Sequence, residues 1–165
     1  MIEVRDLDNE EIEGLLGRLN YGHLACTDGL EPYVVPIHFA YDAPYIYVYT
    51  TEGKKSELIR QNPQICLQTE EVIDNSNWQS VIVQGEAEHL TDEAERSIAL
   101  NAIVRENPAL TPAVSIRWMD NWVRENIEVI YRIMPLQTTG RASVARTETR
   151  TPYVPSSKPG PESVI

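Results

Sequence analysis

The sequence predicts a mainly β domain with flanking helices (α+β), built as a closed or split antiparallel barrel of about six strands. Three observations predict it. Polar and apolar side chains alternate with a period of two along Tyr45–Thr51 and again along Ser80–Leu90. Asp28-Gly29 is a strong hairpin signal between two strand-like runs. Short helical segments separate some of the strands, as in small barrels that a helix crosses.

The first predicted element is an amphipathic helix. Asp8 and Glu11 have the spacing of a capping box, and apolar residues then recur at helical spacing on one face, at Ile12, Leu15, Leu16 and Leu19. Asn20-Tyr21-Gly22 ends this helix. Three strands are predicted next, over 23–27, 33–41 and 45–51.

The second half of the domain alternates helices with strands. A short helix is predicted over 54–61, because Asn62-Pro63 stops it, and strands follow over 64–69 and 80–90. Thr91 is expected to cap another helix, and the last strand covers 127–134. The segment 111–124, which carries Trp118 and Trp122, is compatible with either a loop or a short helix. The expected buried face of the helix after Thr91 consists of Ala94, Ile98, Ala102 and Ile103.

Length and composition indicate one domain and a short tail. A chain of 165 residues has room for one substantial core. From Gly140 onward the sequence loses apolar periodicity and becomes rich in proline and arginine. We therefore expect residues 1–140 to form the domain, and residues 141–165 to be a tail that is either disordered or docked on the dimer.

Net charge, the length of apolar runs and cysteine spacing each argue against particular functions. At −11 the protein repels phosphate backbones, so we expect no nucleic-acid partner. Apolar runs are too short to cross a membrane, and the N-terminal segment lacks the pattern of a secretory signal. Cys26 and Cys66 have no CxxC spacing, which argues against a zinc site or a disulfide framework and favours the cytoplasm. No metal site is expected.

Gly53-Lys54-Lys55-Ser56 is the most specific local feature. It opens a helix directly after a strand, and the free N–H groups, the helix dipole and two ammonium groups all favour an anion there. A charged, solvated helix start explains the same residues equally well from local sequence alone. In a small β domain this segment predicts a seat for the phosphate of a cofactor.

Four segments, in this order, resemble a known family: PYVVPIHFAY, YIYVYT, GKKSELIRQNPQICLQ, and SVIVQGEAEHL after Trp78. They resemble the flavin-nucleotide-binding split barrels related to pyridoxamine 5′-phosphate oxidase, and within these the branch with the nitroimidazole-resistance (Nim) proteins. YRIMPLQTTGR is similar to the final strand of that branch. The resemblance covers roughly residues 15–141, whereas the substrate-binding motif of true pyridoxamine phosphate oxidases is not evident.

The resemblance implies an FMN-binding split β-barrel and a homodimer with the cofactor at the subunit interface. Lys54, Lys55 and Ser56 would hold the phosphate, and Lys55 is the strongest candidate. The full implied set of cofactor-binding residues, some of them from the partner subunit, is Pro36, Ile37, His38, Tyr49, Thr50, Thr51, Lys54, Lys55, Ser56, Gln68, Trp78 and Ser80. Tyr49–Thr51 would line the ribityl region, and Pro36–His38 would follow the isoalloxazine edge.

The implied activity is an FMN-dependent, nitroreductase-like oxidoreductase that reduces or oxidises a small aromatic or heterocyclic molecule. His38 is the candidate catalytic residue on the substrate side, and a nicotinamide electron donor is compatible with the fold. His23 and His89 are expected to be structural or at the surface. Two alternatives stay open: a haem-binding split barrel with His38 or His23 as ligand, and a non-catalytic flavin-binding or interaction module.

Overall fold

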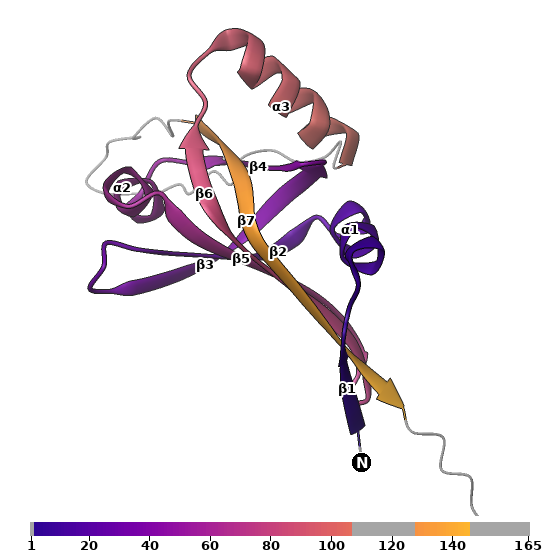
Figure 1. Ribbon diagram of the computed structural model, residues 1–165. Coiled ribbons are helices and arrows are strands. Elements are labelled where there is room, and N and C mark those ends of the chain that lie inside the picture. Colours follow the sequence, from indigo (N-terminus) through magenta and orange to yellow (C-terminus); the bar gives the residue numbers. More distant parts are fainter. Residues whose placement is uncertain (1, 107–127, 146–165) are drawn as a thin grey trace, which may run out of the picture.

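The computed structural model describes residues 2–106 and 128–145 (Figure 1). Within them, seven strands form one antiparallel sheet and three helices pack around it. None of the helices in these two stretches is long and apolar enough to cross a membrane. The elements are β1 (Ile2–Asp6), α1 (Asn9–Arg18), β2 (Tyr21–Thr27), β3 (Pro32–Asp42), β4 (Tyr45–Thr51), α2 (Lys54–Gln61), β5 (Gln64–Asp74), β6 (Asn77–His89), α3 (Glu93–Glu106) and β7 (Glu128–Ala145).

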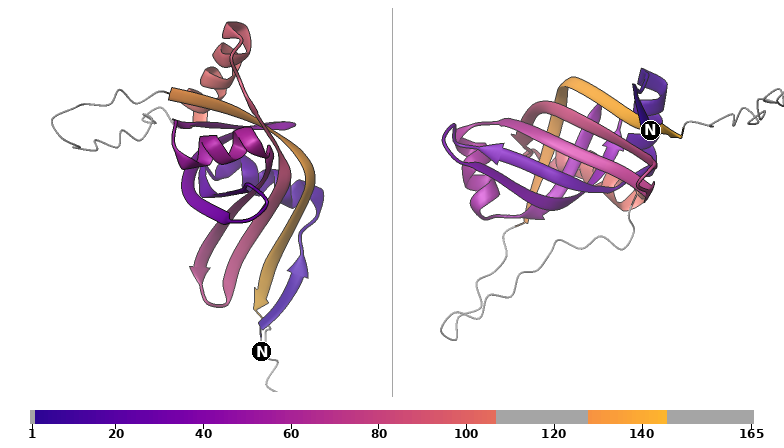
Figure 2. Two further views of the ribbon diagram at one scale, coloured as in Figure 1. Left: turned by 90° about the vertical axis from the view of Figure 1, so that its left-hand side faces the viewer. Right: turned by 90° about the horizontal axis from the view of Figure 1, so that it is seen from below.

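The sheet closes on itself as a split barrel. Its strand order is β1-β7-β4-β3-β2-β5-β6, and β6 also pairs with β7. Six strands therefore form the ring, which confirms the predicted fold class, and β1 is added at the edge of β7. Beyond the ring, β5, β6 and β7 continue as a long twisted arm that carries β1, as the views in Figures 1 and 2 show.

The length of β7 makes this closure possible. It has 18 residues, and its first part pairs with β4 from Thr51↔Glu128 to Ile46↔Ile133. Its other edge pairs with β6 from His89↔Tyr131 to Gln79↔Ala142, and its last five residues pair with β1. Residue patterns predicted only 127–134 of this strand, the family resemblance extended it through YRIMPLQTTGR to Arg141, and β1 was not predicted. The strand also continues five residues past the expected domain boundary at 140, while residues 146–165 of the expected tail lie outside the described residues.

The barrel interior contains the main core. Phe39, Leu24, Ile46 and Leu67 are almost fully buried there, and α1 closes one side with Ile12, Leu15 and Leu16. The predicted capping box of α1 is confirmed. The Asp8 carboxylate accepts a hydrogen bond from the Glu11 N–H, and the Glu11 carboxylate accepts one from the Asp8 N–H. The alternation along β6 is confirmed as well, with Val81, Val83, Gly85 and Ala87 buried.

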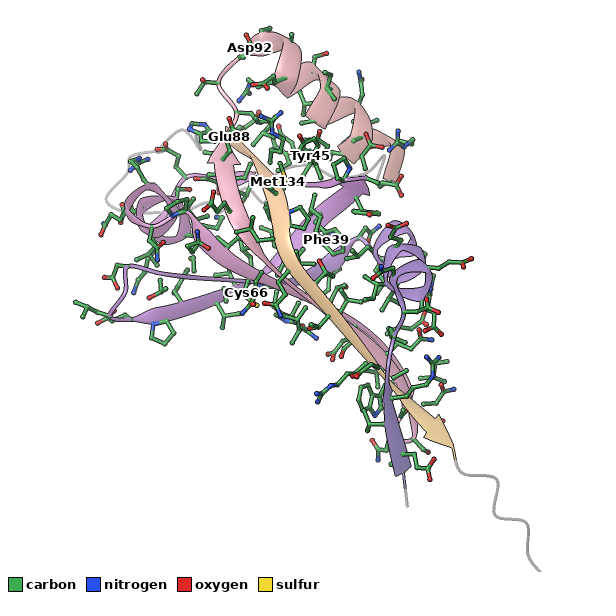
Figure 3. The ribbon with its side chains drawn as sticks, in the orientation of Figure 1. Phe39, Tyr45, Cys66, Glu88, Asp92 and Met134 are labelled. Carbon is green, nitrogen blue, oxygen red and sulfur yellow. The ribbon has the colours of Figure 1, made fainter. Side chains whose placement is uncertain are left out.

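A second, smaller core lies outside the barrel, under α3. Ala99, Ala102 and Ile103 of this helix pack against the outer face of β3, β4 and β7. Two expectations for α3 were wrong. Asp92 (Figure 3), not Thr91, caps it, because the Asp92 carboxylate accepts the Glu95 N–H at 3.0 Å. Of the predicted buried face, Ala94 and Ile98 are both exposed, because the face that packs on the sheet is made of Ala99, Ala102 and Ile103.

Gly85 tests how tightly the barrel closes. A Cβ at this position would lie 2.3 Å from the Met134 carbonyl oxygen, next to the bulge between Gln84 and Gly85. We expect Gly85→Ala to lower the free energy of unfolding by about 2 kcal/mol, since the two backbones would have to separate. Gly14→Ala on the exposed side of α1, with open space around it, should instead stabilise by about 1 kcal/mol. Urea titrations of both variants measure this, and equal effects would contradict the proposed close approach.

Candidate functional site

The site begins where β3 and β4 separate. These strands are paired only from Phe39↔Val48 to Asp42↔Tyr45. Pro32–His38 keeps its pairing with β2 along one edge, whereas its other edge has no partner strand among the described residues. Along such an edge, alternate residues direct their N–H and C=O groups outward. An open strand edge of this kind offers backbone donors and acceptors to a planar ligand.

The N-terminus of α2 lies at the end of this gap. Gly53 precedes the helix in an extended conformation and supplies no side-chain cap, and the first backbone bond of the helix runs from the Glu57 N–H to the Gly53 carbonyl. The N–H groups of Lys54, Lys55 and Ser56 therefore have no capping side chain. Free N–H groups, together with the positive end of the helix dipole, favour a bound anion.

Lys55 turns its ammonium group back over this helix start. Its Nζ donates a hydrogen bond of 2.9 Å to the Thr51 carbonyl at the end of β4. Burial lowers the pKa of Lys55 from its ordinary value, an effect that the nearby Cys26 partly opposes. A half-buried cation whose hydrogen bond goes to a neutral carbonyl is under-compensated, and an anion at the helix N-terminus would relieve this.

Lys54 points the other way, toward the turn between β2 and β3. Its Nζ lies 3.6 Å from a Glu31 carboxylate oxygen and 5.1 Å from the centre of the Tyr33 ring. The side chain is about half exposed, so the ion pair with Glu31 is weak and open to competition from a stronger anion. Both ammonium groups therefore lie near the uncapped start of α2, each with a different partner.

The side chain of Ser56 lies inside the barrel instead of at the helix surface. The residue is 2% exposed, and its hydroxyl makes no hydrogen bond of acceptable geometry. Burial raises the pKa of the nearby Tyr131 phenol, and the Ser56 hydroxyl lies close enough to oppose part of this rise. Its backbone N–H, not its hydroxyl, is therefore the group available to an anion at the helix start.

Three of the predicted site residues stand on one outer face of the sheet. In the strand register, His23 of β2 is flanked directly by Pro36 of β3 and Gln68 of β5. Two residues further along each strand, on the same face, His38 pairs with Tyr21. Their rings meet edge to face with centroids 5.3 Å apart. His38, Pro36 and Gln68 are thus brought together, beside the open edge of β3.

The remaining predicted residues point elsewhere. Ile37 and Thr50 face the barrel interior. Tyr49 lies on the side covered by α3, where burial and a hydrogen bond with Glu128 raise its pKa to about 12. Trp78 and Ser80 lie on the arm, and the Trp78 N–H donates to the Ser143 hydroxyl at 2.9 Å. Within one chain, β3, β4 and β6 therefore direct these predicted residues to different places.

Sequence reasoning gave His23 a structural or surface role, or that of a haem ligand, and did not include it in the flavin-binding set. The structure places His23 between Pro36 and Gln68, and these three residues form a row across the outer face that we call the outer-face row. His23 Nδ1 lies 3.2 Å from Gln68 Oε1. The signal that could have found it is the alternation of β2, in which Tyr21, His23 and Ala25 share one face and Leu24 and Cys26 the other. Cys26 and Cys66 lie on opposite faces of the sheet, and both are free thiols.

Comparison with known proteins identifies the family. Residues 8–142 match the family described as pyridoxamine 5′-phosphate oxidase, and the chain belongs to that family. An uncharacterized protein of Rhizobium meliloti (strain 1021) is 34% identical over 87 residues, which are 53% of this chain. The matched region spans 58% of that relative, little more than half of its length.

Two solved structures share the split-barrel fold. A FAD-binding protein from Mesorhizobium loti is 29% identical, with a TM-score of 0.70 over 88% of this chain and 100% of its own. A proposed 5-nitroimidazole antibiotic resistance protein from Bacteroides thetaiotaomicron is 23% identical, with a TM-score of 0.66 over 87% of this chain and 89% of its own. Together with the family match, they confirm the predicted resemblance to the split barrels related to pyridoxamine 5′-phosphate oxidase.

The lowered pKa of Lys55 gives a pH-dependent signature. Because the folded chain holds this proton less tightly than the unfolded chain, stability should rise as the pH increases through the window between the lowered pKa and about 10.4, the ordinary value. NMR titration of the lysine side chains should find Lys55 below the other lysines, and inorganic phosphate should raise its pKa. In Lys55→Met this part of the stability profile should vanish. A Lys55 pKa at or above the ordinary value would contradict the described environment.

Proposed function

We propose that this protein binds a flavin nucleotide, FMN, at the N-terminus of α2 and along the open edge of β3. The uncapped helix start beside Lys55 is the observation that carries the proposal. Phosphate would take the N–H groups of Lys54, Lys55 and Ser56, and the ring system would lie over the outer face near Pro36 and His23. The FAD-binding relative from Mesorhizobium loti supports a flavin ligand, and FMN needs only the single phosphate seat described here.

Different residues of the chain would bind the phosphate, orient the ring and face the substrate. Lys55 would exchange its bond to the Thr51 carbonyl for a phosphate oxygen, and Lys54 would leave the exposed Glu31 for the same group. Backbone groups of Pro32–His38 would orient the polar edge of the ring. When bound, the flavin supplies the electron transfer, in an oxidoreductase that acts on a small aromatic or heterocyclic molecule. His38, which is exposed beside Tyr21, keeps its proposed role on the substrate side.

We also propose that the outer face is completed by a second copy of the chain. Ile82 continues the row of Pro36, His23 and Gln68 and is 42% exposed, while Val72 and Ile73 are more exposed still at the end of β5. Apolar side chains gathered next to a ligand face favour burial by a partner. Trp78 and Ser80 of the arm would then reach the cofactor of the partner subunit, as the resemblance implies.

The phosphate seat is tested with Lys55→Met. Titration with FMN, followed by its visible absorption and fluorescence, should show affinity about 10- to 100-fold lower than in the unaltered protein, because one charge-assisted hydrogen bond contributes about 1.5–3 kcal/mol. Arg60→Met removes a cation from the same helix, at an exposed position paired with Glu52, and should bind FMN normally.

Three outcomes would overturn the flavin proposal. Equal FMN affinity in the Lys55 and Arg60 variants would show that the helix start is not the seat. If the purified protein retained no added FMN, FMN would be ruled out as the cofactor. A Soret band in the protein as purified would replace the flavin with haem, with His38 or His23 as the ligand to test.

The dimer is tested by charge insertion. Ile82→Glu places a carboxylate in the proposed interface and should give a monomer in sedimentation velocity experiments, with weaker FMN binding because the partner's residues are lost. Val104→Glu, at a comparably exposed apolar position on α3, should leave the dimer intact. A monomeric unaltered protein, or dissociation by the α3 change instead, would refute this interface.

A further inference from the structure

A fork opens between β2 and β5 directly beside the outer-face row. The two strands are paired from Cys26↔Ile65 to His23↔Gln68 and then separate. Gly22 permits the close approach at this point, since a Cβ there would lie 2.3 Å from the Gln68 carbonyl oxygen. The Thr69 hydroxyl bridges the fork by donating to the Tyr21 carbonyl at 2.7 Å. The geometry is thus held from both strands and does not depend on a loop.

The fork contains a cavity of about 260 Å³. It is smaller than the pockets of about 300–1,000 Å³ that accept drug-sized molecules, so its occupant has the size of a single ring. Tyr21 and Val72 supply apolar surface, and His23, Gln68 and Glu70 supply polar groups. The residues that line it are Tyr21, Gly22, His23, Gln68, Glu70 and Val72.

Two polar side chains of this cavity, His23 and Glu70, offer acceptors without a partner in the described residues. Gln68 Oε1 lies 3.2 Å from His23 Nδ1, and because an amide oxygen only accepts, this contact is a hydrogen bond in the tautomer that has its proton on Nδ1. Nε2 then carries a free lone pair and has no partner within residues 2–106 and 128–145. Glu70 likewise has no ion pair in these two stretches, whereas its neighbour Glu71 is held by Arg18 at 2.8 Å. No lysine or arginine lines the cavity.

We propose that this cavity is the subsite for a small aromatic ring that donates hydrogen bonds, either a cation or a neutral N–H-bearing heterocycle. The ring would lie against Tyr21, an N–H group would bind His23 Nε2, and a second N–H or a positive charge would face Glu70. Because His23 also belongs to the row proposed for the flavin ring, the occupant would lie beside the cofactor as its substrate; this last assignment rests on the proposed function. An anionic ring of the same size is disfavoured by Glu70.

Benzamidine and benzoate test the proposal, since they have nearly the same shape and opposite charge. We expect benzamidine to shift the backbone NMR signals of Tyr21–His23 and Gln68–Glu70 in the flavin-free full-length protein, and benzoate to leave them unchanged. Calorimetry should show Glu70→Gln weakening benzamidine about fivefold, the equivalent of about 1 kcal/mol for a partly exposed charge pair. Glu86→Gln, an exposed charge change on the neighbouring strand that lies outside the cavity, should have no effect.

The outcomes separate this proposal from the flavin proposal. Benzoate binding as tightly as benzamidine, shifts confined to other residues, or equal affinities in the Glu70 and Glu86 variants would each overturn the subsite. Benzamidine binding at the fork in a protein that binds no FMN would leave the subsite standing and remove the flavin proposal. In FMN-loaded protein, benzamidine at the fork should also perturb the visible flavin spectrum, and an unperturbed spectrum would overturn the placement beside the cofactor.

Discussion

The separation of β3 from β4 beyond Phe39 is the constraint on which the site depends. A closed ring of six strands satisfies nearly every backbone group internally and offers a ligand only side chains. Here the pairing of β3 with β4 stops after four residue pairs, because β4 continues along β7 and β3 along β2. The gap exposes one edge of Pro32–His38 and leaves room for α2, which fills the barrel end with Leu58 and Ile59. The same separation therefore creates both the open strand edge and the position of the uncapped helix start.

The interior next to α2 is polar at some cost in stability. Ser56 has a buried hydroxyl without a hydrogen bond of acceptable geometry, and Lys55 loses hydration beside Cys26. Each such group is unfavourable in a folded chain unless something compensates it. A position where local rules are broken in this way is characteristic of a functional site, because selection for binding can oppose selection for stability.

Much of this arrangement was predictable from sequence, and the limits have physical causes. The capping box at Asp8 and the alternation along β6 are local patterns, and both were confirmed. β1 was not predictable, since Ile2–Asp6 is exposed along its whole length and is a strand only because β7 offers an edge. Residue patterns ended β7 before Pro135 for a related reason: Pro135 and Gly140 disfavour strands, and long-range pairing overrides that preference. Only the family resemblance indicated the extension, through YRIMPLQTTGR. For the same reason His23 joins the site only through its partners on β3 and β5, which no single segment reveals.

The two ends of the outer face differ in charge. The protein carries a net charge of −11, yet Lys54 and Lys55 both lie at one helix end, where the helix dipole and the ammonium groups favour an anion. Across β3 and β2, the fork at Glu70 has no basic residue lining it. A ligand with an anionic group at one end is therefore attracted to the α2 end and repelled from the fork, and a cationic or N–H-rich ring experiences the reverse. Two molecules of opposite character would therefore occupy adjacent parts of one face, and the proposed transfer of electrons needs a phosphate-bearing cofactor and a small ring to lie close together in this way.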